Sequence, residues 1–465
     1  MKSRDFPTEF AALGFHEKMV LAMLALAGEP MGRIRLNEHL KLAGLRDDDA
    51  QLALDLAGLR GLGLAGEMQH RGWVSTPEIT WPAIKAALDA DALRPLFEAY
   101  TALTPLRRNW EGLAILRSYR QGIAFLRYAL VGGGDPATVG AMLAACMSCH
   151  EAGYVHPLVD ICARPFDPEL FARIHPQVRD LVLTVLMENA QREPASAPQL
   201  RTFAERHVAG GAASMALRVA VAEHLILCGR LDDAAGMLTE LDASLAQFYR
   251  AVIQLLRDDL PAAISGFELS LKTLRRETGK RKMVFPGLGG HLYILALLRA
   301  NDPKHLKSAE TYLDIATRAV QNHDTAVYQQ LSMLRQIRGG TVDPAVLPSR
   351  SWENALQPLM FRALLHYWLA LPQLGDKRAM LEEALALSEQ AGFDLVSAQL
   401  ASLLGRMGGA GNVAHEQRAI ALRQQHRFSE FATWFEREEP WQRQLNALIN
   451  LQPPVNVETV RETRL

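Results

Sequence analysis

The sequence has few cysteines, almost no excess of charge and no long apolar run. Its 465 residues include only four cysteines, too few for a disulfide framework and in keeping with a reducing compartment. Lys and Arg number 50 against 51 Asp and Glu, so no large positive excess is available to coat a nucleic acid. Any contact with nucleic acid is therefore expected to be local.

The longest apolar runs are too short to cross a membrane. Met19 to Ala27 is such a run, whereas a spanning helix needs roughly 20 apolar residues. Asp5, Glu9 and Glu17 precede or adjoin the run, where a secretory signal would have a short basic segment. The sequence thus predicts a cytoplasmic protein that makes no contact with a membrane.

Helical periodicity, by contrast, runs through most of the chain, and 49% of the residues are hydrophobic. The length favours two or three structural units. We predict an all-α protein in which a winged helix-turn-helix-like unit precedes an irregular α-solenoid similar to tetratricopeptide repeats (TPR). The predicted divisions are residues 1–92 for the winged-helix-like domain, 93–230 for a helical repeat region, 231–405 for the TPR-like α-solenoid, 406–452 for C-terminal helices, and 453–465 for a tail or the start of an omitted domain.

The N-terminal prediction rests on three short helices followed by a hairpin. A first helix presents apolar residues from Phe15 to Leu26 on one face and ends at Gly28. A second covers 34–43, and Asp47 to Asp49 supply carboxylates that begin a third. Short β-prone stretches then flank the turn 70–72. This order is typical of a winged helix-turn-helix.

Paired helices predict the solenoid. Residues 248–255 and 263–274 have matching apolar faces, as do 292–296 with 309–316 and 364–368 with 381–391. Alanine where helices approach closely is typical of tetratricopeptide repeats, although the irregular spacing indicates a degenerate array. Between residue 93 and the last few residues we predict no strand. Four helix starts share an N-capping aspartate followed by proline: Asp135-Pro136, Asp167-Pro168, Asp302-Pro303 and Asp343-Pro344.

Cysteine and histidine gather in one place. Cys146, Cys149 and His150 match the pattern of c-type haem attachment, which is incompatible with a cytoplasmic protein. His156 and Cys162 lie close enough in sequence to complete a zinc-binding set with these three residues. The alternative, which we favour, is that the cysteines are small buried core residues of a helix.

Two glycine-containing segments resemble nucleotide-binding loops only superficially. Residues 61–66 read GLGLAG, but a dinucleotide-binding loop must leave a strand and enter a helix, and here the order is reversed. Thr278-Gly279-Lys280 lacks the upstream glycine and the following Ser or Thr of a Walker A motif. We therefore predict no bound cofactor and no catalytic site in this chain.

A basic cluster follows the paired helices of the predicted solenoid. On a loop between helices, such a cluster can bind phosphates or an acidic protein surface, while the alternative is a merely solvated loop. Arg71, in the predicted wing, would add one phosphate contact. The cluster is diluted only by Glu277, and its members are Lys272, Arg275, Arg276, Lys280, Arg281 and Lys282.

The third predicted helix is poorly suited to reading a DNA sequence. Helices that read base edges usually carry Arg, Lys, Asn or Gln. This one carries only one basic residue, Arg60, and four acidic residues: Asp47, Asp48, Asp49 and Asp55. Non-specific contact with the DNA backbone, or docking of a protein, is the better expectation.

Two stretches of the chain resemble a known family. Lys282 to Arg299 (KMVFPGLGGHLYILALLR) and Glu439 to Leu448 (EPWQRQLNAL) are similar to the helical N-terminal region of large bacterial Swi/Snf-type helicases. In that family a helical-repeat region precedes a DNA-dependent ATPase core, so the resemblance implies that the ATPase motifs lie beyond Leu465. At the level of architecture alone, the chain is also similar to bacterial regulators that contain tetratricopeptide repeats.

Three functional hypotheses follow. The first is a non-catalytic region that docks a protein partner in the solenoid groove, or positions duplex DNA, for a Swi/Snf-type ATPase. The second is a free-standing DNA-binding regulator whose TPR-like solenoid senses a partner or ligand. The third is a metal-dependent enzyme that uses the group formed by Cys146, Cys149, His150 and Cys162. We favour the first.

Overall fold

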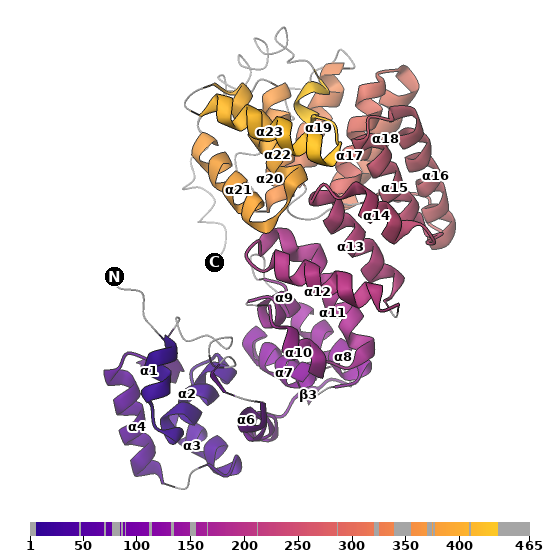
Figure 1. Ribbon diagram of the computed structural model, residues 1–465. Coiled ribbons are helices and arrows are strands. Elements are labelled where there is room, and N and C mark those ends of the chain that lie inside the picture. The colour runs from indigo at the N-terminus through magenta and orange to yellow at the C-terminus, as the bar shows by residue number, and fades with distance from the viewer. Residues whose placement is uncertain are drawn as a thin grey trace, which may run out of the picture. The chain divides into compact units, whose positions relative to one another are not determined.

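The computed structural model describes most of the chain, and most of the described residues are helical (Figure 1). The prediction of an all-α protein is confirmed. None of the described helices is both long enough and apolar enough to pass through a membrane. The described residues are 6–45, 48–68, 71–76, 84, 87–88, 90–110, 114–131, 134–148, 155–164, 166–211, 213–285, 287–319, 325–338, 355–369, 374, 377–408 and 411–435.

The chain divides into two compact units, residues 1–186 and 187–465. The division falls inside helix α11 (Pro176–Asn189). The other elements of the first unit are α1 (Phe6–Ala12), α2 (Phe15–Ala27), α3 (Arg33–Leu42), α4 (Asp49–Gly61), β1 (Ala65–Met68), β2 (Gly72–Ser75), α6 (Ala90–Leu103), β3 (Arg107–Arg108), β4 (Ala114–Ile115), α7 (Tyr119–Val131), α8 (Pro136–Ser148), α9 (Pro157–Cys162) and α10 (Pro168–Arg173).

The first unit begins with three helices and a hairpin. Helices α2, α3 and α4 pack on one another, and β1 pairs antiparallel with β2 in a register that places Met68 opposite Gly72. The hairpin predicted around Arg71 is therefore present. A further antiparallel bridge joins Met31, between α2 and α3, to Trp73 of β2 through hydrogen bonds in both directions. The link ties the α2–α3 connection to the hairpin.

A second pair of strands was not predicted. Arg107 and Arg108 of β3 lie antiparallel to Ile115 and Ala114 of β4, and α8 packs on β4. The pair is only two residues long, too short for a period-two pattern to appear in the sequence. The expectation of no strand before the last residues was wrong here.

The second unit is built from helices throughout its described part. Its elements are η1 (Ala190–Arg192), α12 (Ala197–Ala209), α13 (Met215–Leu227), α14 (Leu231–Leu238), α15 (Ser244–Leu256), α16 (Leu260–Thr278), α17 (Gly287–Ala300), α18 (Pro303–Ala319), α19 (Thr325–Arg338), α20 (Leu356–Trp368), α21 (Arg378–Ala391), α22 (Asp394–Arg406), α23 (Asn412–His426) and η3 (Phe431–Thr433).

Neighbouring helices of the second unit pack as pairs. α13 contacts α14, α15 contacts α16, and α17 contacts α18 (Figure 1). The first helices of successive pairs also touch, since α13 contacts α15 and α15 contacts α17. Alanines and glycines permit these approaches: a β-carbon on Gly266 of α16 would lie only 2.9 Å from Cβ of Ala251 on α15.

Later helices pack back onto the earlier ones. α20 contacts both α17 and α22, and α22 contacts α13. Residues 288–298 of α17 are all buried, as are 395–404 of α22. A helix that is covered on all sides belongs to the core and not to an amphipathic outer layer. In the described part of the second unit, α20 and α22 thus cover part of α17 and α13, which are first helices of two of these pairs.

Several predicted features lie outside the described residues. These are the helix start at Asp343-Pro344, the second stretch of the family resemblance (439–448) and the tail at 453–465. The predicted boundaries after residues 92, 230 and 405 stay predictions.

Candidate functional site

The predicted basic cluster lies on the last turns of α16 and the loop after it. All six of its side chains are exposed, and within the described part of the chain none of them forms an ion pair. Gly279 ends the helix in the left-handed conformation, with φ of 66°, and so turns the chain into the loop. Lys280, Arg281 and Lys282 follow directly. Local structure thus holds six positive charges together in solvent.

The one acidic residue of this cluster is directed elsewhere. The carboxylate of Glu277 accepts hydrogen bonds from the backbone N–H of Ser244, at 3.2 Å, and from its hydroxyl, at 2.6 Å. Ser244 is the first residue of α15, whose N-terminal amides favour a negative charge. Because Glu277 serves that helix end, it neutralises the neighbouring cations less than the sequence alone indicates.

Arg71 belongs to the first unit, whereas the basic cluster belongs to the second. Arg71 is exposed in the turn between β1 and β2. Helix α4 ends at Gly61 and strand β1 begins at Ala65, so 61–66 joins a helix to a strand, as predicted, and cannot place a helix N-terminus at a pyrophosphate.

Two cysteines of the predicted metal-binding set are buried in helices. Cys146 on α8 and Cys162 on α9 have no exposed surface. A β-carbon on Gly122 of α7 would lie 2.6 Å from Cys146 Sγ, so the sulfur fills a space where two helices meet. This agrees with the favoured interpretation of Cys146 as a small core residue.

No metal-binding group appears in the described part of the chain. No cluster of three or more His, Cys, Asp or Glu there has the geometry for a metal ion. Cys149 and His150 lie outside the described residues. His156, a nearby histidine, begins α9 as its N-cap, and its Nδ1 accepts a hydrogen bond from the Leu158 N–H at 3.2 Å.

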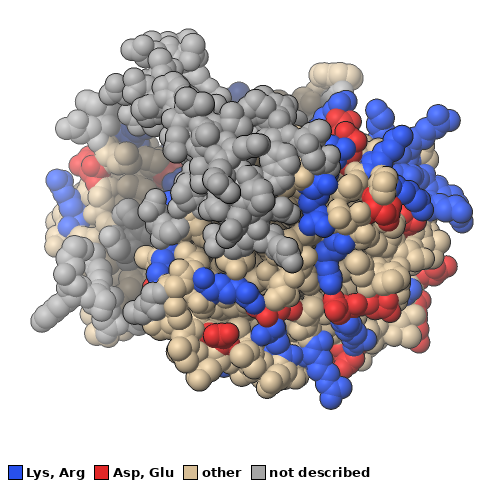
Figure 2. Space-filling view, turned by 90° about the horizontal axis from the view of Figure 1, so that it is seen from above, with Lys and Arg blue, Asp and Glu red and all other residues tan. Residues whose placement is uncertain are grey.

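A cavity of about 430 Å³ opens in the second unit, where α15, α17 and α23 end. We call it the arginine pocket, because four of the described residues around it are arginines. On the face drawn in Figure 2, Lys and Arg side chains gather at the upper right of the view, and elsewhere charged side chains of both signs are interspersed. The residues that line the arginine pocket are Leu256, Arg257, Asp258, Arg299, Arg423, Arg427, Phe428, Ser429, Glu430, Thr433 and Trp434.

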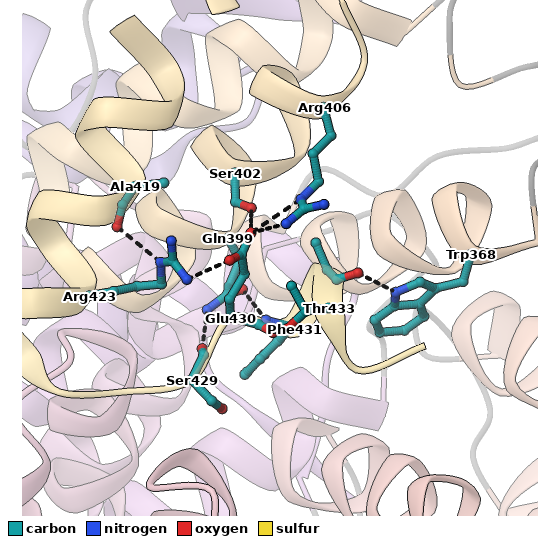
Figure 3. A network of polar contacts seen from close by, with 11 residues as sticks. Trp368, Gln399, Ser402, Arg406, Ala419, Arg423, Ser429, Glu430, Phe431 and Thr433 are labelled. Atoms are coloured by element: carbon teal, nitrogen blue, oxygen red, sulfur yellow. Dashed lines mark hydrogen bonds and ion pairs between the residues drawn. The ribbon is translucent and has the colours of Figure 1, made fainter. Parts of the chain in front are cut away.

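Hydrogen bonds fix the segment that follows α23 along one side of the pocket. The Ser429 N–H donates to the Leu256 carbonyl, at the end of α15, over 2.8 Å. Gln399 of α22 holds the same segment twice, accepting from the Phe431 N–H at 2.8 Å and donating to the Ser429 carbonyl at 3.1 Å (Figure 3). The irregular segment is therefore held by the buried α22.

Glu430 is the centre of a polar network in this segment (Figure 3). Its carboxylate accepts hydrogen bonds from the hydroxyl of Ser402, from Arg406 Nη2 at 2.9 Å and from Arg423 Nη1 at 2.5 Å. Burial alone would raise the pKa of Glu430, but the hydrogen bonds from Ser402 and Arg406 and the charges of both arginines lower it below its ordinary value. Glu430 is therefore held ionised, and Arg423 is positioned by it.

Removing the charge of Glu430 should loosen this side of the pocket. We expect Glu430→Gln to lower the free energy of unfolding by about 1–2 kcal/mol, because an amide accepts weaker bonds from guanidinium groups and turns a donor toward one of them. Urea denaturation followed by circular dichroism measures the change. Glu389→Gln is the matched control, because Glu389 makes an exposed ion pair with Arg418, and its loss should cost less than about 0.5 kcal/mol. Equal losses in both variants would contradict a special role for the Glu430 network.

The arginines of the pocket differ in whether an acidic side chain pairs with them. Arg299 donates to Asp258 at 2.8 Å and stacks over the ring of Trp434, with its guanidinium carbon 4.8 Å from the ring centre. Arg257 pairs with the exposed Asp232, outside the pocket lining. Arg427 is exposed and has no ion-pair partner among the described residues.

Sequence reasoning missed the arginine pocket. Its lining comes from three chain segments, 256–258, residue 299 and 423–434, which are brought together only by the return of α22 and α23 to the earlier helices. The one available signal was the run from Arg423 to Glu430, which spans the end of a helix and contains basic residues, one phenylalanine and one glutamate. That signal gives no partner for the segment.

The chain was compared with protein families, with curated proteins and with solved structures. No family model, no curated protein and no solved structure matches this chain.

Proposed function

We propose that this chain is a non-catalytic interaction region that positions duplex DNA through the basic cluster, as part of a bacterial Swi/Snf-type ATPase. The observation that carries the proposal is the exposed group of six cations at the end of α16, whose one acidic neighbour is bound to Ser244. Lys and Arg that are held together in solvent, with no ion-pair partner among the described residues, form the kind of surface that displaces counterions from phosphates. The likeness of 282–299 to the helicase region supports the choice of DNA as the acidic partner.

The N-terminal part contributes a second, smaller contact in this proposal. We regard α2 to α4 with β1 and β2 as a winged-helix-like unit, because three helices precede a hairpin to which the α2–α3 connection is bridged at Met31. Its third helix is unsuited to reading bases: Asp49 pairs with Arg33, Arg60 pairs with Glu67, and Leu54 is 66% exposed. Arg71 in the hairpin turn is left for contact with the DNA backbone.

The second unit supplies the scaffold of the proposal. Successive contacts of α13 with α15 and of α15 with α17 support a TPR-like solenoid. α20 packs against α17, and α22 packs against α13. Because these contacts occupy part of the solenoid's own surface, we place the binding surface at the loop after α16 and not in the solenoid groove, where a protein partner was predicted.

The test is binding of labelled duplex DNA over a series of salt concentrations. The wild-type chain is compared with a variant in which Arg275, Arg276, Lys280, Arg281 and Lys282 are changed to Ser. We expect wild-type affinity to fall steeply with salt, and the variant to bind at least tenfold more weakly at low salt. For every phosphate that the variant no longer neutralises, the slope of log K against log salt should become shallower by about 0.9.

A control variant with the same change of charge separates local from overall electrostatics. Five other exposed basic residues of the second unit are changed to Ser in it: Arg192, Arg206, Lys304, Lys307 and Arg318. We expect the control to keep most of the affinity. Absence of DNA binding at low salt would overturn the DNA proposal and leave protein docking as the alternative, while equal losses in both variants would overturn the role of the basic cluster.

A further inference from the structure

We infer that the arginine pocket binds the phosphate group of a small organic phosphate. The pocket is distinct from the basic cluster, since the two share no residue. The inference therefore goes beyond DNA positioning and stands or falls independently of it.

The first argument is the supply of hydrogen-bond donors. Arg299 Nη1, Trp434 Nε1 and Ser429 Oγ are buried, and none of these atoms has a hydrogen-bond partner among the described residues. Guanidinium and indole N–H groups can only donate. Leaving such groups unsatisfied is costly, so acceptor oxygens of a ligand in the pocket would be stabilised once these side chains turn toward them.

The second argument is that the carboxylates of the pocket are already engaged. Glu430 accepts bonds from Ser402, Arg406 and Arg423, and Asp258 accepts from Arg299. The oxygens of these two carboxylates can therefore accept few further hydrogen bonds from a ligand. The chemistry presented to a ligand is accordingly that of donors and positive charge.

Charge balance points the same way. Four arginines line the pocket against the two carboxylates of Asp258 and Glu430, and Asp232, outside the lining, pairs with one of the four, Arg257. The C-terminal ends of α15, α17 and α23 are close by, and each carries about half a negative charge, so part of the positive excess stabilises these helix ends. Arg427, beyond the end of α23 and without an ion-pair partner among the described residues, is the cation most available to a ligand.

Phosphate fits this arrangement better than carboxylate. The donors come from separate segments, with Arg257 after α15, Arg299 on α17 and Arg427 after α23. A phosphate ester offers three outer oxygens in a tetrahedron, whereas a carboxylate offers two in a plane, so phosphate can meet donors from more directions. The volume of about 430 Å³ is in the range of small-molecule sites and leaves room for an organic part beside Phe428 and Trp434.

Calorimetric titration at constant ionic strength tests the inference with three probes: inorganic phosphate, adenosine 5′-monophosphate, and adenosine as the matched compound without phosphate. The full chain is compared with the double variant Arg257→Ser/Arg427→Ser. Both side chains are largely exposed, so the variant should fold, which circular dichroism checks. We expect saturable binding of the two phosphate probes, at least tenfold weaker in the variant, and none of adenosine.

Two controls separate this pocket from other positive charges. Arg418→Ser removes a charge from the same helix α23 outside the pocket, and the five-residue variant of the basic cluster removes charge elsewhere. We expect both to bind phosphate within about twofold of the wild type. The inference would be overturned by absence of saturable phosphate binding, by adenosine binding as tightly as its monophosphate, or by an equal loss in Arg418→Ser.

Discussion

The stability of the second unit should fall by about 2 kcal/mol for each of two buried histidines when the pH is lowered from 7.5 to 5.0. Burial, together with the charges of Arg201 and Arg230, lowers the pKa of His224 to about 3. Burial also lowers the pKa of His366 to about 3, together with the charges of Arg362 and Lys377. Since typical domains are stable by only about 5–15 kcal/mol, a combined loss near 4 kcal/mol is large.

The direction of the effect follows from where the proton binds. In the unfolded chain a histidine takes up a proton below its ordinary pKa of 6.5, while the folded chain holds His224 neutral until about pH 3. Protons therefore favour the unfolded state throughout this interval. The full stability is present above pH 6.5 and is lost progressively as the pH falls toward 3.

His224→Leu isolates one of these contributions. Neither ring nitrogen of His224 has a hydrogen-bond partner among the described residues, and the ring packs edge-on against Phe393, so an apolar side chain suits the site. We expect the free energy of unfolding at pH 7.5 to be unchanged or higher in the variant, and the loss between pH 7.5 and 5.0 to shrink by about 2 kcal/mol.

Urea denaturation at both pH values measures the difference, and His224→Leu/His366→Leu should remove about twice as much of the loss. The measurement at pH 7.5 serves as the internal control for packing. A pH dependence identical to that of the wild type would contradict the assignment of the effect to His224.

Local features of the fold were predictable because neighbouring residues determine them. Asp135, Asp167 and Asp302 each accept a hydrogen bond from a backbone N–H of the helix that starts at the following proline, as their Asp-Pro pattern predicts. The same bonds lower the pKa of Asp135 and Asp302. The hairpin around Arg71 was equally predictable, since the turn and its flanking residues are contiguous.

Features that depend on distant segments were not predictable. The apolar residues of α22 indicate a buried helix, but nothing in 394–406 identifies α13 as a neighbour. The basic cluster was found because its members are adjacent, whereas the arginine pocket requires 256–258 and 423–434 to meet. Likewise, Glu277 looked like a diluting charge, and only its contact with Ser244 shows where it is engaged.

Gly290 stands at a point of close approach that only a glycine fits, and Gly290→Ala is the second change with a large expected effect. A β-carbon there would lie well under 3.0 Å from the backbone oxygen of Phe285 and 2.6 Å from the hydroxyl of Tyr328. Phe285 cannot move away easily, because Tyr312 accepts from its N–H at 2.7 Å and donates to its carbonyl at 2.9 Å, while Phe248 stacks on its ring. A clash with a clamped backbone should cost about 3 kcal/mol.

Gly236→Ala is the control, since Gly236 also lies in a helix of the second unit but has open space around its missing β-carbon. Alanine loses less conformational freedom than glycine on entering a helix, so this variant should be more stable by about 0.5–1 kcal/mol. Urea denaturation of both variants beside the wild type gives the comparison. A Gly290→Ala chain as stable as the wild type would mean that the segment from Phe285 to Gly290 is less tightly held than its contacts with Tyr312 and Phe248 imply. The opposite signs expected for one substitution at two helical glycines make packing, and not helix propensity, the cause under test.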